Sequence, residues 1–186
     1  MTLKPKSFLA RSLVKGLAIL AVSVQGLQAQ TPVPGDTLVA SAREIINAAR
    51  YCGLVTFDES GGTRVRTMDP FPPEPDMVVW MGTHRNSRKV LDIEKDPRVT
   101  LYYHSPTASG YVAISGTARL VDDPTEKSGR WKEEWGAFYA DRETDYLLIQ
   151  VIPNRMEVID YSRGIQGDPR TWEPPFVMFP GGHAGL

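Results

Sequence analysis

The stretch that most constrains the fold is an apolar run followed by a polar break and a short helical pattern. Met77 to Met81 is apolar, Gly82-Thr83 breaks the run, and a helical pattern extends from Ser87 to Lys95. Serine is a favoured residue immediately before a helix, and Asp96-Pro97 ends the pattern. The sequence therefore predicts a strand, a tight connection and a short helix, in this order.

The charges of this short helix are reversed relative to its dipole. The basic residues at or just before its start are His84, Arg85, Arg88 and Lys89, and the acidic Asp92 and Glu94 come later. Because a helix start has unpaired N–H groups and partial positive charge, cations there cost stability. A bound phosphate would reverse this cost, held by the N–H groups, the Thr83 and Ser87 hydroxyls, Arg88 and Lys89. The charges alone leave a solvated basic turn open as the alternative.

The amino-terminal segment has the pattern of a secretory signal peptide. Its basic residues are Lys4, Lys6, Arg11 and Lys15, and an apolar run at 17–22 is followed by small and polar residues up to Ala29. We expect residues 1–29 to be removed and the protein to be exported to the periplasm or secreted. The run is far shorter than the roughly 20 residues of a membrane span. No membrane association is therefore expected after cleavage, and an uncleaved anchor is the alternative.

The expected mature chain of 157 residues is long enough for one domain. Removal of the leader takes away four positive charges and no negative ones, which moves the formal net charge from −1 to −5. This acidic balance argues against nucleic-acid binding and favours a small anionic ligand for the local basic cluster. Cys52 is the only cysteine, so we expect a buried thiol. The three histidines lack metal-site spacing, and no metal site is predicted.

The remaining patterns predict mostly strands. A helix is expected from Asp36 or Thr37 to about Gly53, with Leu38, Ala42, Ile45, Ile46 and Ala49 on one face. The expected strands are 54–57 and 63–68 as a hairpin, 77–81, 99–103, 111–121, and 146–152 continuing over 155–161. A helix begins at Asp123-Pro124. This order predicts a mainly β, α+β domain built as a six-stranded antiparallel barrel, closed or partly closed.

Several positions carry more specific expectations. Gly116, on the apolar face of its strand, predicts a bend or a close approach, and Pro153 predicts an edge strand or a bulge. Trp131, Trp135 and Phe138 recur on one stripe, which favours core or subunit interface over a cofactor site. Residues 162–186 are rich in Gly and Pro and are interpreted as a mobile tail or an arm laid over a partner.

With this element order, the chain resembles the FMN-binding split β-barrel proteins of the pyridoxamine 5'-phosphate oxidase superfamily, within the general-stress-protein branch. The resemblance is carried by Arg64–Met68, by Trp80–Thr83 with Asn86–Lys89, and by Asp96–Val99. It covers roughly residues 36–161. It implies a split-barrel domain over 30–161, between the signal peptide (1–29) and the tail (162–186).

The resemblance also implies a cofactor site. Ser87, Arg88, Lys89 and Arg66 would bind the phosphate of FMN. Thr67 and Met68 would offer backbone to the isoalloxazine edge, and Trp80 to Thr83 would line the ring and ribityl chain. Members of the family are homodimers with the site at the interface, so Gln150 and Trp172 are further candidate contacts.

The same resemblance predicts an FMN-dependent oxidoreductase that acts on an unidentified small molecule, and the sequence identifies no catalytic residue. True pyridoxamine phosphate oxidases end with an Arg- and His-bearing segment, whereas this chain ends with Thr171 to Pro175 and a lone His183. That activity is therefore not expected. The alternative is a non-catalytic stress protein that binds flavin, deazaflavin or haem, with His84, His104 and His183 as the available axial ligands.

Overall fold

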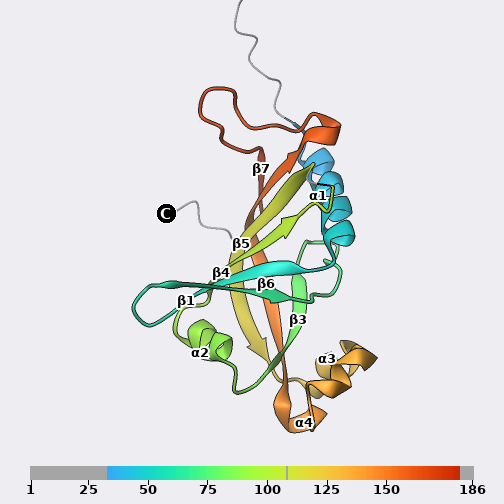
Figure 1. The fold of residues 1–186 in the computed structure, drawn as a ribbon, viewed down its shortest axis with the longest axis vertical. Helices are drawn as coiled ribbons and strands as arrows, with labels where there is room; N and C mark the ends of the chain where they lie inside the picture. Colours follow the sequence, from blue (N-terminus) through green and yellow to red (C-terminus); the bar gives the residue numbers. More distant parts are fainter. Residues whose placement is uncertain (1–32, 108, 181–186) are drawn as a thin grey trace, which may run out of the picture. The chain divides into compact units, whose positions relative to one another are not determined.

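The computed structural model describes residues 33–107 and 109–180 (Figure 1). The predicted signal peptide and His183 lie outside the described residues. The elements are α1 (Gly35–Ala49), β1 (Cys52–Phe57), β2 (Thr63–Met68), β3 (Val79–His84), α2 (Arg88–Lys95), β4 (Arg98–His104), β5 (Gly110–Val121), α3 (Pro124–Gly129), the 3-10 helix η1 (Glu133–Ala137), α4 (Arg142–Asp145), β6 (Tyr146–Asp160), the 3-10 helix η2 (Tyr161–Arg163) and β7 (Phe176–Met178). Among the described helices, none is long and apolar enough to cross a membrane.

The strands form one antiparallel sheet in the order β2-β1-β4-β5-β6-β3, as the alternation of apolar residues predicts. Its two edges, β2 and β3, approach each other where the chain leaves β2. There Pro70 forms a bridge to Met81, and the Phe71 N–H donates to the Trp80 carbonyl oxygen at 2.8 Å. The sheet thus curls until its edges touch at one point, and the predicted partly closed antiparallel barrel is confirmed.

Of the two alternatives predicted from Pro153, an edge strand or a bulge, the bulge is confirmed. β6 pairs with β5 along its length, and its other side pairs first with β3 and then with β7. The register shifts where Ser115 pairs with Arg155 but Gly116 pairs with Pro153, so Asn154 is the extra residue. A bulge tolerates proline inside a sheet because the ladder is already interrupted there.

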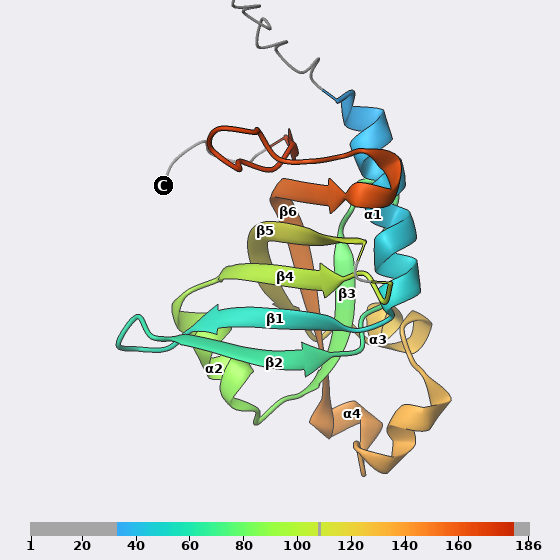
Figure 2. The ribbon, with the colours of Figure 1, turned by 45° about the horizontal axis from the view of Figure 1, so that its top comes forward.

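Helix α1 packs across one end of the sheet, against β4, β5, β6 and β7 (Figure 2). Its buried face contains Leu38, Ala42, Ile45 and Ile46, as predicted. Two boundaries differ from the sequence prediction. The helix begins at Gly35, and it ends at Ala49 because Arg50 adopts a positive φ of 61°. Gly53 lies within β1 and does not cap the helix.

The connection between β5 and β6 does not continue the helical stripe that the sequence predicts. Asp123 caps α3 by accepting from the Glu126 N–H at 2.9 Å, as expected, but the helix ends at Gly129. Trp131 then lies in the loop after α3, Trp135 lies on η1, and Phe138 is 74% exposed. The period of an α-helix therefore does not apply beyond Gly129.

The segment after β6 returns to the sheet. Ile165 bridges to Asp160, and β7 adds to the second half of β6. Ile165, Val177 and Phe179 pack against the main core. Residues 162–180, which the sequence suggested as a mobile tail or a partner-binding arm, are thus in large part a cover on their own domain.

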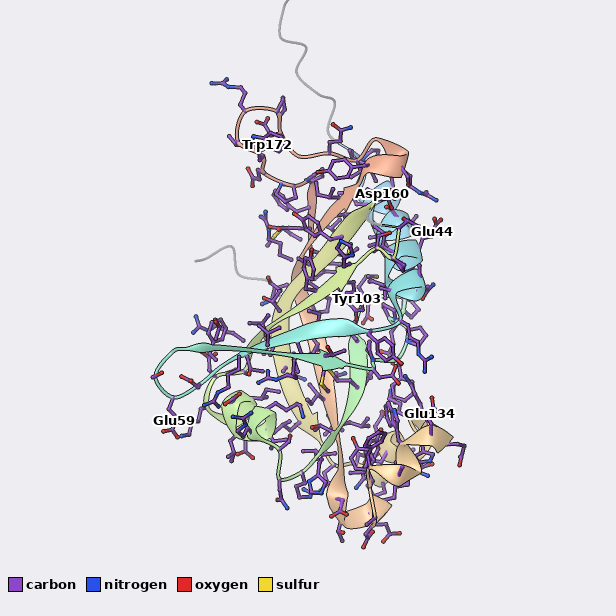
Figure 3. All side chains as sticks on the ribbon, in the orientation of Figure 1. Glu44, Glu59, Tyr103, Glu134, Asp160 and Trp172 are labelled. Carbon is purple, nitrogen blue, oxygen red and sulfur yellow. The ribbon has the colours of Figure 1, made fainter. Side chains whose placement is uncertain are left out.

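Asp160 links α1 to the end of β6 (Figure 3). It should make the stability of the fold depend on pH in the acid range. Its buried carboxylate accepts from Ser41 Oγ at 2.7 Å and Ser162 Oγ at 2.6 Å. Burial acts to raise the pKa of Asp160, but the hydrogen bonds from Ser162 and Ser41 lower it overall. Stabilisation from a lowered pKa is present above the ordinary value of about 3.9 and is lost as the pH falls through the folded-state value.

We therefore expect Asp160→Asn to lower the free energy of unfolding by about 1–2 kcal/mol at pH values of about 6 to 7. The difference in free energy of unfolding between Asp160→Asn and wild type should disappear at acid pH. Urea titrations at a series of pH values in the acid range would measure it. Glu44→Gln, which removes an exposed partner of Arg163, is the matched control and should change little. A difference between Asp160→Asn and wild type that does not depend on pH would contradict a lowered pKa of Asp160.

Candidate functional site

The start of α2 carries a cluster of hydroxyls and cations that face one another. Ser87 stands at the predicted cap position, but its hydroxyl makes no capping hydrogen bond. It lies instead 3.0 Å from Thr83 Oγ1, which also accepts from Lys89 Nζ at 3.1 Å. The first N–H groups of α2 are therefore left without a side-chain cap, beside two hydroxyls and an ammonium group.

A buried carboxylate, Asp92, organises the arginines of β2 next to this cluster. Asp92 is 4% exposed and accepts from Arg64 Nη1 and Thr56 Oγ1, both at 2.7 Å. Arg66 Nη2 lies 3.4 Å from the same carboxylate, and Arg66 Nη1 donates to Thr56 Oγ1 at 2.7 Å. Arg66 is thus held toward α2, and its contact with a phosphate stays a prediction. The role of Asp92 was not found in the sequence, because its partners are distant along the chain.

The cations of the cluster destabilise one another. Burial lowers the pKa of Lys89, and the neighbouring Arg66 lowers it further. Burial also lowers the pKa of Arg66, with Arg64 and Arg88 adding to the effect and Asp92 opposing it. Asp92 and the partly exposed Asp58, which lies 3.4 Å from Arg64, are the carboxylates beside these four cations, so an excess of positive charge remains. A bound anion would reduce this excess.

A hollow of ≈ 360 Å³ adjoins the cluster where the edges β2 and β3 separate below their bridge. This volume lies within the roughly 300–1,000 Å³ that is typical of ligand pockets. The lining residues are Thr67, Met68, Asp69, Gly82, Thr83, His84, Lys89, Trp135, Phe138 and Tyr139. Four of the predicted site residues, Thr67, Met68, Thr83 and Lys89, therefore meet in one place.

Other predicted residues lie elsewhere. Arg88 lines a different hollow of ≈ 450 Å³, next to Arg64 and the β1–β2 turn. Trp80 is an interior residue: its Nε1 donates to Glu74 Oε1 at 3.0 Å, and the Arg130 guanidinium lies 4.0 Å from its ring centroid. Trp80 therefore does not line the predicted ring site.

The two predicted interface contacts are also separate from the cluster. Gln150, on β6, pairs with Trp80 of β3 and does not line the hollow. Trp172 is 78% exposed in the loop before β7, and Figure 3 places it at the opposite end of the view from Glu134. Within one chain, neither residue joins the site.

The model of the family described as pyridoxamine 5'-phosphate oxidase like matches residues 38–165. The chain belongs to this family. Its sheet is thus the split barrel of the pyridoxamine 5'-phosphate oxidase-like proteins. No curated protein matches the sequence.

Solved structures support the fold. General stress protein 26 from Bacillus anthracis has 24% identity and a TM-score of 0.61, over 75% of this chain and 97% of that one. A protein from Clostridium acetobutylicum that is related to general stress protein 26 has 17% identity and a TM-score of 0.61, over 69% and 92%. A pyridoxamine 5'-phosphate oxidase-related, FMN-binding protein from Nostoc punctiforme has 16% identity and a TM-score of 0.54, over 81% and 100%.

The aromatic side of the hollow is the part of this family member that sequence reasoning missed. Trp135 and Tyr139 come from the connection between β5 and β6, and Gly82 of β3 makes room for Trp135 and for Tyr146 at the start of β6. A Cβ on Gly82 would lie 2.5 Å from Tyr146 Cε2 and 2.6 Å from Trp135 Cζ3. The available signal was the strand pattern itself, since a glycine inside a strand often marks a close approach.

His84 and Cys52 are poorly placed for chemistry of their own. His84 lines the hollow, but its Nδ1 accepts from the Asn86 N–H at 3.1 Å, and its Nε2 lies 3.8 Å from Asp145 Oδ1. Burial raises the pKa of the Cys52 thiol to about 12. The prediction of a buried thiol is confirmed, and its raised pKa makes it a poor nucleophile near neutral pH.

Proposed function

We propose that this protein is an exported FMN-binding flavoprotein that acts as an oxidoreductase on a small organic molecule. The observation that carries the proposal is the junction of the Lys89–Thr83–Ser87 cluster with the hollow between β2 and β3. A phosphate and a planar ring on one molecule match a basic helix start beside a pocket of this size. The family match and the FMN-binding relative support this choice of ligand.

The proposal assigns a role to each residue of the cluster. Lys89, the Thr83 and Ser87 hydroxyls and the N–H groups at the start of α2 would hold the phosphate. Arg66 would add positive charge from β2, and Thr67 and Met68 would present the strand edge to the ring system. FMN supplies hydride and electron transfer when bound, so the protein has only to orient it, shield it from water and set its electrostatics.

The proposal includes a homodimer whose second copy covers the outer face of the β2-β1-β4-β5 region. Val65 and Tyr102 are exposed there, and Tyr102 stacks on Tyr111 with ring centroids 5.5 Å apart. A Cβ on Gly53, between them, would lie 3.6 Å from Val65 and 4.0 Å from the Cβ of Tyr102, so these groups form one surface. A continuous exposed apolar surface of this kind favours association.

The test is an FMN titration of residues 30–186, followed by absorption spectra and size-exclusion chromatography. We expect flavin bands that co-elute with a dimer. Lys89→Gln should weaken FMN binding by about tenfold, the value of one charge-assisted hydrogen bond. Arg88→Gln should weaken it less, because Arg88 lines the neighbouring hollow. Without FMN the same variants should be slightly more stable, since each removes a cation from a helix start.

Lys95→Gln is the matched control, because Lys95 lies at the other end of α2 and pairs with Glu59. It should leave FMN affinity unchanged. The proposal would be refuted if the wild-type protein did not bind FMN, or if Lys89→Gln bound FMN as tightly as wild type does. A Soret band in the absorption spectrum of the purified protein would show that it binds haem in place of flavin.

A further inference from the structure

The rim of the hollow carries an aromatic side chain that the fold does not use. Trp135 and Tyr139 are held by their neighbours: Trp135 Nε1 donates to Asp69 Oδ2 at 3.4 Å, and Tyr139 packs on Tyr146 with centroids 5.0 Å apart. Phe138, between them in sequence, lines the same hollow but is 74% exposed. Among the described residues, no aromatic ring or cation stacks on it.

The packing of the segment that carries Phe138 distinguishes this residue from an isolated exposed side chain. Single exposed apolar side chains are common and need no explanation. Here the ring stands at the mouth of a ligand-sized hollow, and a network of edge-to-face and tilted contacts among Trp131, Trp135, Tyr139 and Tyr146 packs its chain segment against the domain. A packed segment that projects one large ring beside a pocket presents a stacking surface to a ligand in that mouth.

The segment that carries Phe138 is acidic. It spans residues 133–145 and contains Glu133, Glu134, Asp141, Glu143 and Asp145, none of which lines the hollow itself, and its only basic residue is Arg142. Arg142 is occupied, because it donates to the Lys127 carbonyl oxygen at 2.7 Å and lies 4.5 Å from the Trp131 ring centroid. Lys132 is occupied by Asp69 Oδ1 at 2.8 Å and by the Pro70 carbonyl oxygen at 3.0 Å. Lys89, the cation that lines the hollow, belongs to the cluster and donates to Thr83 Oγ1.

We propose that Phe138 is a specificity-determining residue that stacks on the ring of a planar, uncharged or cationic substrate at the mouth of the hollow. The inference rests on the proposed function, since it assigns the interior of the hollow to FMN and the mouth to the second reactant. It also predicts that the mouth disfavours a substrate that carries a phosphate, because the segment that bears Phe138 contains five carboxylates and one cation, Arg142, which is already occupied.

Naphthoquinone and its sulfonate are suitable probes, because they share a ring and differ in charge. Binding to the FMN-loaded, oxidised protein is measured by quenching of flavin fluorescence, and no electron transfer is needed. We expect naphthoquinone to bind at least tenfold more tightly than its sulfonate. Phe138→Ala and Phe138→Leu should weaken naphthoquinone binding by about tenfold, the upper range for loss of one aromatic contact, and Phe138→Trp should retain it. Tyr161→Ala, which removes an exposed ring from η2, is the matched control.

Flavin content separates the possible failures. The inference requires that Phe138→Ala bind FMN as wild type does. If this variant loses FMN together with naphthoquinone, the ring belongs to the cofactor site, and the inference is wrong while the proposed function stands. Equal naphthoquinone binding by wild type and Phe138→Ala, or tighter binding of the sulfonate, also overturns it. A wild-type protein that takes up no FMN refutes the proposed function itself.

Discussion

Replacement of Asp92 by alanine is expected to lower the free energy of unfolding by about 3–5 kcal/mol, the usual cost of leaving buried partners of an ion pair uncompensated. The carboxylate is 4% exposed and joins α2 to β1 and β2 through Thr56, Arg64 and Arg66. Without it, the buried Thr56 hydroxyl loses its acceptor, and two arginines face each other near Arg88. Arg64 is 37% exposed and can turn to water, so most of the cost falls on Arg66 and Thr56.

Urea denaturation of the FMN-free protein measures this effect. Glu94→Ala removes an exposed carboxylate from the same helix and should change stability by less than about 0.5 kcal/mol. The loss of stability in Asp92→Asn should lie between those of Asp92→Ala and Glu94→Ala, because asparagine keeps an acceptor oxygen and loses the charge. If Asp92→Ala behaved like Glu94→Ala, the arginines of β2 would be screened by water, and Asp92 would have no organising role.

Most of the fold could be predicted from the sequence where the signal was local. The buried face of α1, the β1–β2 hairpin and the long strand β5 follow from the spacing of apolar residues and from turn residues such as Gly61 and Gly62. The place of β6 in the middle of the sheet could not be predicted. Pro153 signals an interrupted ladder, but only the pairing with distant segments decides between an edge and a bulge.

The helical stripe from Trp131 to Phe138 failed for a related reason. Three aromatic residues at helical spacing fit a continuous helix, but Gly129 ends α3 and a 3-10 turn follows. Trp135 then packs over Gly82 of β3, while Phe138 turns outward. The spacing indicated packing in the core correctly for Trp135 and for the partly buried Trp131, but not for Phe138, because tertiary contacts and not helix period set the direction of these side chains.

The candidate site shows the same difference between local signals, which the sequence reveals, and long-range contacts, which it does not. Reversed charges at the start of α2 indicated an anion site, because the argument needs only one helix and its dipole. Asp92 looked like one of two ordinary acids of that helix, and its pairing with Arg66 joins residues that are 26 apart in sequence. The aromatic wall comes from a third segment, so no local pattern could place it beside Lys89.

Gly116→Ala is expected to lower the free energy of unfolding by about 2–3 kcal/mol, at the upper end of the cost of overpacking. A Cβ at this position would overlap the carbonyl oxygen of Ile152 and lie 3.2 Å from the Cα of Pro153. Both obstacles are backbone atoms of the central strand β6, so no side chain can rotate away. The strand would have to move at the bulge that accommodates Pro153.

The damage should extend to the segment that follows the barrel, because the Phe179 N–H donates to the carbonyl oxygen of the bulge residue Asn154 at 3.0 Å. We expect amides of β7 to exchange faster with solvent in Gly116→Ala, while those of the β1–β2 hairpin keep their protection. Gly129→Ala is the control: a Cβ there meets nothing within 4 Å at the end of α3, so stability should hold or rise by up to about 1 kcal/mol. Equal effects of the two substitutions would show that β6 can shift freely at Asn154, and the bulge would then not fix the register of the sheet.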